Sequence, residues 1–139
     1  MKYLLDTNIL SEIMRGAPNP HVVVWLDQQN PAHLYISAIT VAEILYGIAR
    51  LPEGQRKQKL AIAAVAMFQE DFKNRICGFD QFSAEFYADL VNQRVCRGLA
   101  ISQSDAQIAS IALCQQMTVV TRNIKDFSQI DGLTVLNPF

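Results

Sequence analysis

The sequence predicts an α/β fold in which helices cover both faces of a small parallel sheet. Short apolar segments that suit buried strands alternate along the chain with longer segments of helical spacing. The chain has 139 residues, half of them hydrophobic, which is enough for one core. Because no repeat, linker or low-complexity segment divides the chain, we expect one domain over residues 1–139.

Two strands and three helices are expected in the first 51 residues. Asn8 suits a helix cap and Gly16 a helix stop, whereas the three valines after Pro20 leave the second helix ambiguous. Apolar residues at positions 41, 44, 45 and 48 fall on one helical face. The expected elements are a strand over 3–5, a helix over 8–15, a helix from residue 21, a strand over 34–37 and a helix over 40–51.

Three more helices and three more strands are expected in the remaining residues. A long helical segment with a basic start follows the Pro-Glu-Gly break, and Gly98 ends the helix that comes after it. The expected helices cover residues 55–72, 82–97 and 104–116. The expected strands cover residues 75–79, 117–121 and 133–136.

Three acids lie close to strand ends, which in a parallel sheet is where ligands bind. Asp6 directly follows the first strand, Glu43 lies in the first turn of the helix after the second strand, and Asp105 opens the helix before residues 117–121. Each position also has a purely structural explanation, because acids and hydroxyls cap helices. Thr40 with Glu43, and Ser104 with Gln107, match the capping-box spacing.

Taken together, the three acids indicate a cation site. Converging carboxylates repel one another unless a cation lies among them. Oxygen ligands suit Mg²⁺ or Mn²⁺, and the two histidines and three cysteines show no spacing that would hold zinc. Neither an EF-hand loop, a phosphate-binding loop nor a dinucleotide-binding glycine pattern is present.

Charge and cysteine content restrict the class of protein. The net charge of −1 gives no general attraction to nucleic acid, so a local basic patch such as Arg50, Arg56, Lys57 and Lys59 would be needed; a solvated helix face explains that run equally well.

We expect the three cysteines to be small core residues and His21 and His33 to be surface or packing residues. Asp6 interrupts the first apolar run, and residues 60–68 are too few to span a bilayer, so we expect a soluble, cytoplasmic protein.

Five segments in order resemble PIN-domain ribonucleases of the VapC/FitB toxin type. They read LLDTN, SAITVAEILYGIARL, GLAISQSDAQIASIAL, VVTRNIKDF and the terminal LNPF, and they run over nearly the whole chain. The resemblance implies a three-layer α/β/α fold and Mg²⁺- or Mn²⁺-dependent endonucleolytic cleavage of RNA, with tRNA as a candidate substrate. It also implies a homodimer and a cognate antitoxin that blocks the site and lends DNA binding to the complex.

The resemblance also assigns roles to individual residues. Asp6, Glu43 and Asp105 match the first three acids of the family, as metal ligands and catalytic groups. Where the family often has a fourth acid in a Thr-x-Asp block, this chain has Thr121-Arg122-Asn123, so an amide replaces the carboxylate. Asp126 could compensate, although a solvated loop acid is the favoured interpretation.

The implied mechanism gives these groups separate tasks. Asp6 and Asp105 would hold the ion, while Glu43 would complete its shell or orient the attacking water. The hydrogen-bonding groups Thr7, Asn8, Thr121 and Asn123 would hold ligands or water, with helix capping as their structural alternative. Arg122 could contact an RNA phosphate.

Three other functions compete with this one. A haloacid dehalogenase-type phosphotransferase needs a second acid where this chain has Asn8, and a receiver domain needs an aspartate at the end of a middle strand, where this chain has Ser37 or Phe79. The third is a catalytically weakened PIN scaffold that only binds RNA or a partner, which the amide at residue 123 keeps open.

Overall fold

Five parallel strands form the centre of the structure, a computed structural model that describes all residues 1–139. The strand order is β3-β2-β1-β4-β5, and every neighbouring pair is parallel. The α/β class predicted from the sequence is therefore confirmed. The strands are β1 Tyr3–Leu5, β2 Leu34–Ser37, β3 Ile76–Cys77, β4 Thr118–Val120 and β5 Val135–Leu136.

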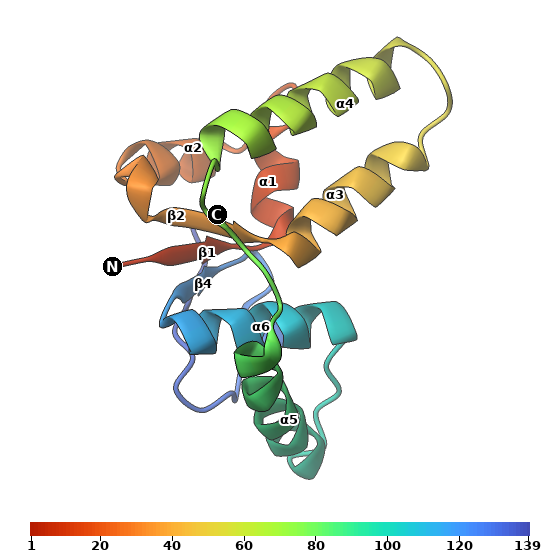
Figure 1. Cartoon of the computed structure of the whole chain (residues 1–139). Coiled ribbons are helices and arrows are strands. Elements are labelled where there is room, and N and C mark those ends of the chain that lie inside the picture. Colours follow the sequence, from red (N-terminus) through yellow and green to blue (C-terminus); the bar gives the residue numbers. More distant parts are fainter.

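Six α-helices cover the two faces of this sheet, with α1 to α4 on one side and α5 and α6 on the other (Figure 1). The second helix, which the sequence left ambiguous, forms after Pro20, a residue that suits a first helical turn. The helices are α1 Thr7–Ile13, α2 Pro20–Asp27, α3 Ala38–Ala49, α4 Gln55–Ala66, α5 Gln81–Cys96 and α6 Gln103–Gln115. Shorter turns are the 3₁₀ helices η1 Pro31–His33 and η3 Ile124–Phe127 and the π-helical turn η2 Met67–Asp71.

The strand side chains alternate between two hydrophobic cores. Leu5 and Val120 pack toward α1 to α4, whereas their neighbours Leu4 and Val119 pack toward α5 and α6. All four side chains are fully buried, and burial of each stabilises the fold by about 1.5–3 kcal/mol. Both faces of the central strands are therefore apolar, as a parallel sheet between helix layers requires.

The chain reverses its winding direction between β1 and β4. Strands β2 and β3 extend the sheet on one side of β1, and β4 and β5 extend it on the other. Asp6 leaves β1 and Thr121 leaves β4 at this switch point, and the backbone N–H of Asp6 donates to the carbonyl of Val120 at 2.9 Å. A crevice at such a point is the usual ligand position in α/β sheets.

Several local details differ from the sequence predictions. Asp6, not Asn8, caps α1, and Ser37 and Ser102, not Thr40 and Ser104, cap α3 and α6. The long helix expected over 55–72 ends in the π-helical turn.

The cysteines only partly meet the expectation that they are core residues, although Cys77 packs against the core under α5 and α6. All three cysteines are free, but Cys96 is exposed, which corrects the expectation that each is a core residue; Cys77 and Cys114 are half-buried. His21 and His33 are exposed. None of the helices combines the length and the apolar character that crossing a bilayer requires.

Candidate functional site

Asp6 is the innermost acid of the site, with only 6% of its surface exposed. One carboxylate oxygen accepts a hydrogen bond from the backbone N–H of Thr7 at 2.8 Å. The other accepts from Thr121 Oγ1 at 2.8 Å and from Asn8 Nδ2 at 3.3 Å. Asn8 Nδ2 also donates to Thr121 Oγ1 at 3.2 Å. These bonds join the residues after β1 to those after β4 and fix the carboxylate at the switch point.

Glu43 is tied to this group through a row of hydroxyls. Thr7 Oγ1 donates to Glu43 Oε1 at 2.7 Å, so its own oxygen is free to accept from Thr40 Oγ1 at 3.0 Å. Ser37 Oγ in turn donates to Thr40 Oγ1 at 3.4 Å. The hydroxyl dipoles all run toward the Glu43 carboxylate, an arrangement in which each bond strengthens the next. The local spacing predicted that Glu43 closes a capping box on Thr40. In the structure Glu43 instead accepts from Thr7, and the backbone N–H of Thr40 donates to Ser37 Oγ.

Asp105 lies in the first turn of α6, where its backbone N–H donates to Ser102 Oγ at 3.1 Å. Burial raises the pKa of its side chain, and the hydrogen bond from Ser102 opposes this effect. The charges of Asp126 and Glu43 raise the pKa further. Asp126 is exposed on η3, yet its charge acts on Asp105 more strongly than that of Glu43.

Burial also raises the pKa of Asp6, to about 6, against the effect of its hydrogen bonds from Thr121 and Thr7. The charges of Asp105 and Glu43 add to the increase. Each of the three acids thus acts electrostatically on at least one of the others, so the fold places them within electrostatic range of one another. Their mutual repulsion is what a bound cation would relieve.

The chemistry of the donor groups fits a hard divalent ion. Asp6 offers two carboxylate oxygens, held by a backbone N–H, an amide nitrogen and a hydroxyl, and no histidine or cysteine is among its contacts. No three acid, histidine or cysteine side chains lie close enough together to enclose an ion with protein ligands alone. Mg²⁺ usually takes one or two carboxylates and keeps several waters, so an open arrangement of acids suits it. Asp6 and Asp105, with Glu43, are the residues that would hold it.

Asn123, at the fourth position of the acid pattern, makes no hydrogen bond to the carboxylate of Asp6. Asn123 is exposed, and its backbone N–H donates to Thr121 Oγ1 at 3.0 Å. Arg122 donates its backbone N–H to Asn8 Oδ1 at 3.2 Å, and its guanidinium lies over the ring of Phe139, 4.9 Å from the centroid. The contact of Arg122 with RNA stays a prediction.

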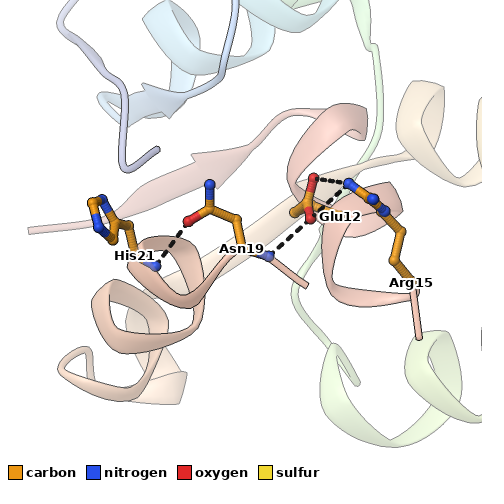
Figure 2. Close-up of polar contacts among 4 residues, drawn as sticks. All are labelled: Glu12, Arg15, Asn19 and His21. Atoms are coloured by element: carbon orange, nitrogen blue, oxygen red, sulfur yellow. Dashed lines mark hydrogen bonds and ion pairs between the residues drawn. The ribbon is translucent and has the colours of Figure 1, made fainter. Parts of the chain in front are cut away.

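A second buried acid, Glu12, was missed from the sequence (Figure 2). Both of its carboxylate oxygens lie 3.2 Å from Arg15 Nη1, and it accepts from the backbone N–H of Asn19 at 2.9 Å. The Asn19 bond, more than the neighbouring arginine, lowers its pKa. Glu12 therefore fixes the turn between α1 and α2 and holds Arg15. The three-residue spacing of Glu12 and Arg15 was the available signal.

A groove of about 900 Å³ opens beside Glu43, between α1, α3 and α4. Exposed basic residues, among them Arg15, lie at its margin, and Arg56 and Lys59 make no ion pair. Lys57 is instead paired with Glu53 at 2.6 Å. Apolar side chains line the groove beneath them: Met14, Ile44, Ile48, Leu51 and Leu60.

Comparison with known proteins identifies relatives that match over nearly the full chain. The chain is 43% identical to plasmid stability protein StbB of Pseudomonas syringae pv. tomato, covering 98% of this chain and 97% of the relative. It is 38% identical to toxin FitB of Neisseria gonorrhoeae, covering 98% and 97%. It is 35% identical to VapC ribonuclease Y4jK of Sinorhizobium fredii, covering 98% and 96%.

Two solved structures share the fold of this chain over nearly its full length. The structure of FitAB bound to the IR36 DNA fragment superimposes with a TM-score of 0.92 at 39% identity, covering 98% of this chain and 94% of the other. A toxin–antitoxin complex from Klebsiella pneumoniae gives a TM-score of 0.69 at 25% identity, covering 99% and 98%.

The PIN domain family model matches residues 3–133. The chain therefore belongs to the PIN-domain family, within the group of VapC and FitB toxins.

Proposed function

We propose that this protein is a Mg²⁺-dependent endoribonuclease toxin, with Mn²⁺ as an alternative ion, that is neutralised by a cognate antitoxin. The observation that carries the proposal is the position of Asp6. It is buried at the switch point of the sheet, bonded to Thr121, and electrostatically coupled to Glu43 and Asp105. The relatives named as VapC ribonuclease and toxin FitB support the reaction class and the biological role.

Each acid has a task in this proposal. Asp6 and Asp105 provide carboxylate oxygens for the ion, which when bound would polarise a phosphoryl oxygen and lower the pKa of a water. Glu43, exposed at the mouth of the site, orients that water or accepts its proton. Thr7 fixes the Glu43 carboxylate, and Thr121 fixes that of Asp6.

The groove beside Glu43 supports the antitoxin part of the proposal. Its apolar lining and unpaired basic residues suit an amphipathic segment with acidic flanks. Because Glu43 itself lines the groove, a segment bound there would cover one of the three acids. DNA would be contacted only through such a partner, because the chain has a net charge of −1.

A second function, binding of RNA or a partner without cleavage, is favoured by one observation. The residue at the fourth acid position is Asn123, which uses its backbone for its hydrogen bonds with Thr121 and Asp126. Asp126, in the same segment as Asn123, is an acid whose charge acts on Asp105. The two functions differ in whether RNA is cut.

The experiment is a divalent-ion titration of the purified protein with a mixed tRNA substrate. We expect no cleavage in a chelator, cleavage that rises with Mg²⁺ or Mn²⁺, and no cleavage with Glu43→Gln. Glu85→Gln, an exposed acid on α5, is the matched control and should cleave like the wild type. Binding of RNA without cleavage at any ion concentration would establish the second function instead.

A further inference from the structure

Arg94, near the end of α5, is a buried cation that the proposed reaction leaves unused. Only 4% of its surface is exposed, and none of the three ion pairs in the structure includes it. Its Nε atom is buried without any hydrogen-bond partner. Burying a charge without an opposite charge costs free energy, so its other contacts must compensate.

The two terminal nitrogens of Arg94 hold two separate segments of the chain. Nη2 donates to the carbonyl of Ala100 at 2.6 Å, in the loop that leads to α6. Nη1 donates to the carbonyls of Ser128 at 2.7 Å and Lys125 at 3.3 Å, at η3. A planar guanidinium has a fixed angle between its donors, so these bonds also fix the two segments relative to each other.

Each of these segments carries an acid. Ala100 lies two residues before Ser102, the cap whose hydroxyl accepts from the N–H of Asp105. Asp126 belongs to η3, next to Lys125. The guanidinium is near enough to Asp105 to act on its charge, in the direction opposite to that of Asp126.

We propose that Arg94 is a positioning residue that holds the Asp105 segment and the Asp126 segment together, and so sets the affinity of the site for a divalent ion. The inference rests on the proposed metal site. The side chain acts from the protein interior, without touching the ion or RNA. It keeps near each other two acids whose mutual repulsion would otherwise separate them in the absence of an ion.

The test measures Mn²⁺ affinity by calorimetry on the full chain, together with denaturant unfolding of the metal-free protein. Arg94→Lys keeps the charge but replaces the two-pronged donor with a single nitrogen. Arg97→Lys is the matched control. Arg97 lies three residues after Arg94, at the end of α5, and is exposed. It donates to the carbonyl of Gln129 at 2.6 Å and to the Asp131 carboxylate at 3.3 Å.

We expect Arg94→Lys to weaken Mn²⁺ binding by about 10- to 100-fold while Arg97→Lys stays near the wild-type value. A folded Arg94→Lys protein that binds Mn²⁺ as tightly as Arg97→Lys would overturn the inference, even if it were less stable. Asp105→Asn checks the proposed function separately. If the wild type binds no Mn²⁺, or Asp105→Asn binds it as the wild type does, the proposed metal site is wrong and the inference fails with it.

If Arg94→Lys does not fold, amide hydrogen exchange of the wild-type chain decides. Residues 100–105 and 124–128 should then open as one unit with the same free energy, and Mn²⁺ should protect both. Independent opening of the two segments, or protection of only one by Mn²⁺, would overturn the inference.

Discussion

Asp6 is shielded from water by the fold, and its raised pKa makes the stability of the protein depend on pH. In the unfolded chain its pKa is near 3.8, and burial raises it to about 6 in the folded protein. The folded state therefore binds more protons than the unfolded state between these values. Stability falls as pH rises from about 4 to about 6, and the cost persists above pH 6.

We predict that Asp6→Asn removes this cost in metal-free protein. Relative to the wild type, the free energy of unfolding of the variant should increase by about 2–3 kcal/mol between pH 4 and pH 7, because an amide stays neutral. Denaturant unfolding in a chelator at several pH values measures it. Parallel pH profiles for the two proteins would show that Asp6 keeps an ordinary pKa.

Thr7 is the second residue with a specific prediction. Thr7→Val keeps the shape but removes the hydroxyl that donates to Glu43, so the carboxylate loses its fixed orientation. We expect RNA cleavage to fall by about 10- to 100-fold. Thr134→Val, an exposed threonine beside β5, should leave cleavage unchanged. Equal rates for both variants would remove Thr7 from the site.

The sequence could predict which acids lie within electrostatic range of one another, but not how each is held. Asp6, Glu43 and Asp105 were identifiable because strand ends share one edge of a parallel sheet. The partner of Glu43 is Thr7, 36 residues away, and a local capping pattern contains no information about such a contact. Arg94 was missed for the same reason, since its acceptors at Lys125 and Ser128 are 31 and 34 residues distant.

At the scale of elements, the helix starts determine where Glu43 and Asp105 point. Ser102 and Ser104 both begin a capping-box pattern, with Asp105 and Gln107 three residues later, and spacing alone does not choose between them. In the structure Ser102 has extended backbone angles and accepts from the N–H of Asp105. Asp105 therefore lies at the third helical position, with its side chain near the cap.

We predict that Ser102→Ala lowers the free energy of unfolding by about 1 kcal/mol, because one N–H at the start of α6 loses its acceptor. Ser104→Ala, two residues on, is the matched control and should change stability by less than about 0.5 kcal/mol. Denaturant unfolding of both variants measures the difference. A larger loss of stability with Ser104→Ala than with Ser102→Ala would show that Ser104 caps the helix, as the sequence predicted.

Element types were more predictable than element limits. Apolar spacing indicated the α-helices and strands, with only the second helix left ambiguous, since both cores need periodic apolar side chains. The limits depend on tertiary contacts. Strand β3, expected over 75–79, is only Ile76–Cys77 because it pairs with the last two residues of β2 alone.

For the whole molecule, strand order is what brings three acids that are far apart in the sequence within electrostatic range of one another. Periodicity predicted a parallel sheet, but it did not contain the order β3-β2-β1-β4-β5. That order places β4 beside β1, so Thr121 reaches Asp6 across 115 residues of sequence. The helices that carry the other two acids, α3 and α6, lie on opposite faces of the sheet (Figure 1).

The most direct test of this account compares RNA cleavage in Mg²⁺ by the wild type, Asp6→Asn and Asp89→Asn. Asp89 is an exposed aspartate on α5 and serves as the control. We predict that Asp6→Asn, folded and at least as stable as the wild type at pH 8, loses at least about 100-fold of the cleavage rate, while Asp89→Asn keeps it. Cleavage by Asp6→Asn at the wild-type rate would contradict the assignment of this site.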